Sequence, residues 1–124
     1  MATDKLTTRE IAREEWPDFF DEFSREHEGW SVTIERLDPA LGDQIEVENH
    51  AFQGIVAERK GEPKVIEIFT GSTAKESSTH VIQNPARVWI EEAGEDAGAA
   101  VEIESEDRVK TLLRFQSERA GSGR

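Results

Sequence analysis

The stretch WPDFFDEFSREHEGW, residues 16–30, decides the fold. Its large side chains recur at helical intervals and lie on one side of a helix, whereas charged side chains occupy the rest of its surface. The side chains of this stripe are Trp16, Phe19, Phe20, Phe23 and His27. We therefore expect an amphipathic helix whose aromatic stripe packs on another element of the protein.

Capping and helix-breaking residues mark the ends of this helix. We assign residues 8–28 to the helical region, because Thr7 and Glu10 have the spacing of a capping box. Pro17 cannot donate a hydrogen bond to the carbonyl of Arg13, so the regular helix is expected to begin near Arg13. Gly29 is expected to end it.

Beyond the helix, apolar side chains alternate with polar ones, which is the period of a β-strand with one face in water. Segments rich in Gly, Pro, Asn, Asp and Ser separate these runs. Gly54 lies inside the second run, where we expect a sharp bend or a β-bulge. The predicted strands lie close to residues 30–37, 44–59, 64–70, 79–82, 87–92, 99–104 and 108–115.

This order of elements predicts an α+β fold. We expect an N-terminal amphipathic helix packed on a strongly curved antiparallel sheet or a small β-barrel of about five to seven strands. A helix followed by a bent strand, a second strand, a variable loop and two short strands is similar to the element order of Sm-like barrels. A barrel of the Sm-like or SH3-like kind is therefore one form that the predicted sheet can take.

Length and composition predict one domain over residues 1–124. The chain has 124 residues, of which 35% are hydrophobic, and one core can absorb a chain of roughly 100–150 residues. We place the ordered core at about residues 8–116. The ends, residues 1–6 and 117–124, lack hydrophobic periodicity and carry small polar residues, so we expect both to be flexible.

The charge of the chain disfavours some classes of partner. Asp and Glu number 27 and Lys and Arg number 15, which gives a net charge of −12. Because nucleic-acid binding depends on a Lys and Arg surface that meets phosphate, the acidity disfavours a nucleic-acid partner. No apolar run approaches the roughly 18 residues of a membrane span, and the N-terminus has no apolar segment for export. We predict a cytoplasmic protein with no membrane partner.

The sequence carries no motif typical of catalysis or of cofactor binding. There is no cysteine, and His27, His50 and His80 are far apart in the sequence, whereas local metal sites use closely spaced ligands. A Gly-x-Ser-x-Gly elbow, a Gly-x-Gly-x-x-Gly loop and a Walker-type loop are all absent. We predict that the protein is not an enzyme and that it has no metal and no cofactor.

Four residues near the helix are candidates for a ligand or interaction site. Trp16, Phe20 and Trp30 would line an apolar pocket where the helix covers the sheet, with His27 as the polar group. The alternative is that all four are packing residues, with His27 placed favourably near the C-terminal end of the helix dipole.

Two further candidates lie on a predicted strand. Trp89 alternates with Val88 and Ile90, so it shares a face with Arg87. A Trp that points outward beside Arg is typical of a binding anchor, because these two residue types concentrate binding energy at interfaces. The alternative is a second small core under the helix.

Several segments resemble those of a known family. They are REEWPDFFDEFSREHEGW at residues 13–30, QGI at 53–55, IEI at 66–68 and HVIQNPARV at 80–88. In this order they are similar to a small bacterial family known as domain of unknown function 5335, over about residues 10–116. The resemblance implies a small single-domain bacterial protein and implies no activity.

Two classes of function remain open, and a third is disfavoured. The first is a non-catalytic module for protein interaction or self-assembly, whose partner is another protein or a second copy docked on exposed strand edges and aromatic surface. The alternative is a small-molecule-binding protein or enzyme with a pocket between helix and sheet. An Sm-like RNA binder is the second alternative, which the acidity disfavours.

Overall fold

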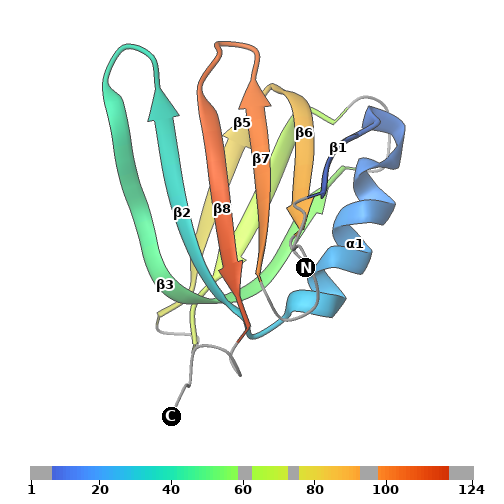
Figure 1. Cartoon of the computed structure of the whole chain (residues 1–124), viewed down its shortest axis with the longest axis vertical. Coiled ribbons are helices and arrows are strands. Elements are labelled where there is room, and N and C mark those ends of the chain that lie inside the picture. Colours follow the sequence, from blue (N-terminus) through green and yellow to red (C-terminus); the bar gives the residue numbers. More distant parts are fainter. Residues whose placement is uncertain (1–6, 59–62, 73–75, 93–97, 118–124) are drawn as a thin grey trace, which may run out of the picture.

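Eight antiparallel strands and one α-helix make up the described part of the chain. The computed structural model describes residues 7–58, 63–72, 76–92 and 98–117. The strands form one sheet in the order β1-β6-β7-β8-β2-β3-β4-β5 (Figure 1). The elements are β1 (Thr7–Ile11), a 3₁₀ turn η1 (Arg13–Glu15), α1 (Trp16–His27), β2 (Ser31–Asp38), β3 (Gly42–Ala57), β4 (Val65–Thr70), β5 (Ser78–Gln83), β6 (Pro85–Glu92), β7 (Ala99–Ser105) and β8 (Lys110–Gln116).

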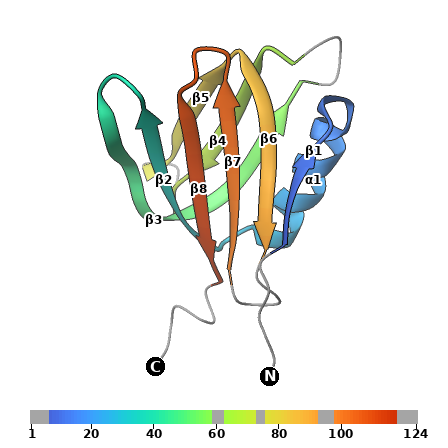
Figure 2. The same ribbon diagram turned by 45° about the horizontal axis from the view of Figure 1, so that its top comes forward.

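The predicted fold class is wrong in its strand count, in the position of the helix and in its barrel form. The sheet has eight strands, and β1 precedes the helix. β1 was assigned to the helical region, but its five residues pair with β6, from Thr7 opposite Glu92 to Ile11 opposite Val88. The sheet is open, because among the described residues the end strands β1 and β5 pair only with β6 and β4. In Figure 2 α1 lies beside β1. This side of the core is therefore covered by a helix and not by another strand paired with β1.

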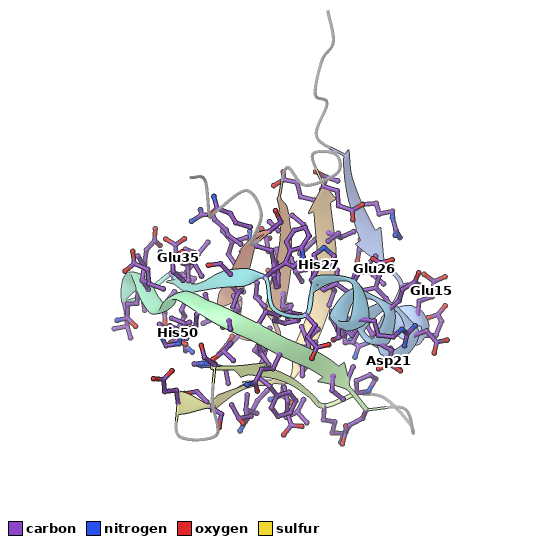
Figure 3. All side chains as sticks on the ribbon, turned by 90° about the horizontal axis from the view of Figure 1, so that it is seen from below. Glu15, Asp21, Glu26, His27, Glu35 and His50 are labelled. Atoms are coloured by element: carbon purple, nitrogen blue, oxygen red, sulfur yellow. The ribbon has the colours of Figure 1, made fainter. Side chains whose placement is uncertain are left out.

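The long strand β3 carries the sheet from one layer into a second. Its first part pairs with β2, and its last six residues, from Phe52 to Ala57, pair with β4. Two register shifts in the β2 ladder and one between Phe52 and Gly54 bend the strand, as β-bulges do. The bulge predicted at Gly54 is thus confirmed. β3, β4 and β5 form the small layer, which faces the large layer of β1, β6, β7, β8 and β2 (Figure 3).

The aromatic stripe of α1 fills the helix end of the space between the layers. Trp16, Phe20, Phe23 and His27 are the buried residues of the helix. Phe23 contacts the rings of Phe52 and Phe115 edge-on, at centroid distances of 6.2 and 5.0 Å. The helix therefore packs on both layers at once, on β3 through Phe52 and on β8 through Phe115.

Only part of the predicted flexible ends lies within the described residues. Residues 1–6 and 118–124 lie outside them, whereas Ser117 is buried, with 5% of its surface exposed. No helix of the described segments is long and apolar enough to cross a membrane.

Candidate functional site

A cleft of about 460 Å³ lies between the two layers and away from the aromatic core of α1. Four buried apolar side chains form its floor: Ile34, Ile68, Ile82 and Val109. Polar side chains from both layers surround this floor, namely Arg36, Glu46, Thr79, His80, Gln83, Ser105, Asp107 and Thr111. The accessible surface of the cleft is mainly polar, and its volume lies in the usual range of ligand sites, roughly 300–1,000 Å³.

Strand register places His80 on the inner face of the small layer. His80 of β5 lies opposite Ile68 of β4, and Ile82 lies opposite Ile66. Paired residues of an antiparallel ladder share a face, and both isoleucines of β4 are fully buried. His80 therefore faces the large layer across the cleft.

A β-bulge brings the carboxylate of Glu46 to the same cleft. Ile34 pairs with Val47, but the next residue of β2, Glu35, pairs with Ile45, so Glu46 is the extra residue of β3. Such a residue breaks the alternation of the strand and re-aims its side chain. Glu46 of β3 and Arg36 of the adjacent strand β2 consequently both line the cleft.

The charged groups of the cleft are only weakly engaged by the protein. The guanidinium of Arg36 lies 3.8 Å from the carboxylate of Asp38, which is beyond hydrogen-bond distance, and 41% of the Arg36 side chain is exposed. Asp107 accepts a hydrogen bond from the amide of Val109 at 3.0 Å, which fixes the β7–β8 turn. The Nε2 atom of His80 is buried and has no hydrogen-bond partner among the described residues. A buried polar atom without a partner is uncommon in folded proteins.

The four predicted site residues near α1 lie in or against the core. Trp16 is 1% exposed and donates its ring N–H to the carbonyl of Ile11 at 3.0 Å, and Phe20 is fully buried. His27 stacks on Phe23 at 3.9 Å, and its Nδ1 lies 2.9 Å from the Phe23 carbonyl oxygen. Because that oxygen only accepts, Nδ1 carries the proton. Trp30 is half-buried and meets His27 edge-on at 4.4 Å.

The rings around His27 therefore fill the space in which a pocket was predicted. Figure 3 shows His27 at the end of α1 that adjoins the strands, with Glu15 at the other end of the helix and His50 on the far side of the molecule. Ligand binding by these four residues stays a prediction.

The other two predicted residues lie on the outer face of the large layer. Val88 and Ile90 are buried, so Trp89 and Arg87 point to the opposite face, as the alternation indicated. Trp89 lies between Glu10 of β1 and Glu102 of β7 and borders a shallow hollow of about 230 Å³. Arg87 pairs with Glu104 of β7 and is exposed. The structure thus separates the six predicted residues into two groups on opposite faces of the sheet.

The first part of β3 is a free strand edge. Residues 42–50 pair with β2 on one side, and within the described ranges no strand pairs with them on the other. With β2, which pairs with β8 on its other side, they form a hairpin whose turn is at the upper left of Figure 1. Leu41 and Ile45 on this hairpin are 70% and 58% exposed.

The residues of the cleft were not predicted as site residues from the sequence. Arg36 is two residues beyond Ile34 and four beyond Val32, so strand alternation places its side chain on the same inner face. This alternation was the sequence pattern that could have predicted Arg36 as a cleft residue. Glu46 has no such signal, because a bulge reverses its parity.

No group of three or more His, Asp or Glu side chains in the described segments is arranged to hold a metal ion.

These features define an open, two-layered antiparallel β-protein with one packed helix and a polar cleft between its layers. A model for a family of unknown function, DUF5335, matches residues 7–123, and the chain belongs to this family. It is also similar to an uncharacterised protein of Aquifex aeolicus (strain VF5), with 27% identity over 112 residues that cover 90% of this chain and 94% of the relative. No solved structure matches the chain.

Proposed function

We propose that the protein is a non-catalytic interaction module that binds an extended, basic segment of another protein along the free edge of β3. The observation that carries the proposal is the unpaired edge of residues 42–50, with two large apolar side chains exposed beside it. An unpaired edge presents backbone N–H and C=O groups that an additional strand can use.

Charge selects the chemistry of the partner. Asp43, Glu46 and Glu48 all lie on this edge and are exposed. Two copies of the edge would bring these carboxylates together, which disfavours pairing with a second copy. A strand with Lys or Arg between apolar residues would meet the carboxylates and cover Ile45. The partner is therefore a different protein with a basic segment. The expected cytoplasmic location stays a prediction.

A peptide titration tests this proposal. We would add an eight-residue peptide, in which Lys alternates with Val and Thr, to ¹⁵N-labelled protein and follow the backbone amides by NMR. We expect shifts and slower hydrogen exchange at residues 42–50, and weaker binding at high salt. A peptide with Glu in place of Lys should leave these amides unchanged.

Two triple variants with equal charge separate a specific edge from general acidity. Asp43→Asn with Glu46→Gln and Glu48→Gln should weaken binding of the Lys peptide about tenfold or more. The matched control neutralises three exposed carboxylates of the helix region, Glu15, Glu22 and Glu26, and should change binding little. Equal weakening by both variants, or shifts that avoid residues 42–50, would contradict the proposal.

A further inference from the structure

The cleft between the layers brings together apolar side chains, a cationic side chain and anionic side chains. Apolar residues lie beneath its floor: Ile34 and Ile68 are fully buried, whereas Ile82 and Val109 are 7% and 8% exposed and offer a small accessible apolar surface. Its polar groups include a cation, Arg36, and carboxylates from a second strand and a turn. A ligand that matches all three needs an apolar body, an anionic group and a cationic group.

Arg36 is the group suited to an anion. Its inward position lies between Thr111 of β8 and the bulged segment of β3, since Arg36 pairs with Thr111 on one side and with Gln44 on the other. Thr111 also lines the cleft. A guanidinium binds a carboxylate through two parallel hydrogen bonds, and Asp38 at 3.8 Å does not occupy it in this way.

Glu46 is the group suited to a cation on the same ligand. The bulge brings its carboxylate to the cleft on the strand next to Arg36, and no described residue forms an ion pair with it. A simple anion would be repelled by Glu46 and Asp107, and a simple cation by Arg36. A zwitterion meets both signs of charge favourably.

We propose that this cleft binds a small zwitterion with an apolar side chain, of the size of a free aliphatic amino acid or a dipeptide. The carboxylate of the ligand binds Arg36, its ammonium group binds Glu46, and its side chain lies against the accessible surface of Ile82 and Val109. His80 faces this volume from the small layer, and its buried Nε2 gains a polar neighbour when the cleft is filled. The site is separate from the free strand edge, although Glu46 borders both.

Calorimetric titration with matched ligands tests the proposal. The probes are L-leucine, the dipeptide Ala-Leu, 4-methylpentanoate, which lacks the amine, and 3-methylbutylamine, which lacks the carboxylate. We expect one of the two zwitterions to bind at least about tenfold more tightly than either singly charged probe. The dipeptide and the amino acid together report which length fits. Amide shifts on binding should include His80.

Single substitutions assign each charge. Arg36→Gln should weaken the zwitterion and 4-methylpentanoate about tenfold and leave the amine unchanged, whereas Glu46→Gln should weaken the zwitterion and the amine. Matched controls on the outer face are Arg114→Gln and Glu102→Gln, which should leave all affinities unchanged. Both cleft positions are at least partly exposed, so these variants should fold.

Three results would overturn the assignment: no binding of either zwitterion at millimolar concentration, equal affinity for 4-methylpentanoate, or equal weakening by the outer-face controls. The outcome is distinct from that of the peptide titration. Arg36→Gln leaves Asp43, Glu46 and Glu48 unchanged, so it should weaken the amino acid or dipeptide and not the Lys peptide.

Discussion

Gly71, just after β4, has a backbone conformation that no other residue type can adopt in this structure. Its φ is 128°, and a Cβ built there would lie 2.5 Å from the Cα of Ser77 and closer still to the carbonyl oxygen of Glu76. Its own amide donates to the carbonyl of Ala51 at 2.8 Å, so the segment is tied to the bend of β3. Backbone atoms cannot rotate away as a flexible side chain can.

We therefore expect Gly71→Ala to lower the free energy of unfolding by more than about 3 kcal/mol, because backbone overlap adds to the roughly 1–2 kcal/mol cost of a left-handed residue. Urea unfolding followed by tryptophan fluorescence measures it. Gly29→Ala is the control, since φ there is 88° and no atom lies within 4 Å of the added Cβ. That variant should lose only about 1 kcal/mol. Equal losses would show that the segment after β4 yields easily.

At the scale of elements, one serine fixes the helix to the bent strand. The hydroxyl of Ser24 accepts a hydrogen bond from the amide of Ile55 at 2.9 Å and donates one to the carbonyl of the same residue at 3.1 Å. A Cβ at Gly54 would lie 3.7 Å from the Ser24 hydroxyl, an ordinary contact distance, so the hydrogen bonds to Ile55 and not the absent side chain of Gly54 fix this approach.

Ser24→Ala should lower the free energy of unfolding by about 1–3 kcal/mol, since it leaves the part-buried amide of Ile55 without its partner. The control is Ser31→Ala, whose hydroxyl bonds the exposed side chain of Asn49 at 3.3 Å; we expect a loss below about 0.5 kcal/mol. Thermal unfolding followed by circular dichroism compares the two. A Ser24 variant as stable as the control would mean that aromatic packing alone holds the helix.

The elements themselves were largely predictable, and their exceptions have physical causes. The seven predicted strands each match an observed strand within two residues at either end, because alternation is a local property of the sequence. β1 was missed because a strand of five residues has little room for alternation, and its Thr7 and Glu10 also fit a helix cap. The cleft was missed because it depends on the pairing of distant strands and on the bulge at Glu46, which the sequence pattern does not encode.

At the scale of the whole molecule, the local sequence pattern could not predict whether the sheet closes into a barrel. The bend at Gly54 was predictable from the sequence. Closure, however, requires the two end strands to meet. β1 and β5 lie in different layers, and the aromatic stripe of α1 is packed between these layers. Asn84, with φ of 53°, is the single residue that joins β5 directly to β6 and so turns the chain from the small layer to the large one. The sequence predicted a strongly curved antiparallel sheet or a small barrel; the sheet is open, and a cleft lies between its layers.

The net charge of −12 also acts on the molecule as a whole. Mutual repulsion of like charges destabilises a compact state, and salt screens it. Among the described residues, salt would weaken surface ion pairs such as Lys110 with Glu102 at 3.7 Å and Arg114 with Glu35 at 3.0 Å, and surface pairs contribute little. Relief of repulsion should therefore outweigh loss of attraction.

We expect the midpoint of thermal unfolding to rise by several degrees as NaCl increases from about 10 to about 200 mM, a range in which screening dominates over effects of salt on apolar hydration. The control is the variant with Asp43→Asn, Glu46→Gln and Glu48→Gln, which removes three negative charges from one edge. If repulsion is the cause, this variant should be more stable than the natural sequence at 10 mM NaCl and should gain less from added salt. A midpoint that falls with salt would show instead that the exposed ion pairs govern the electrostatic stability of the fold.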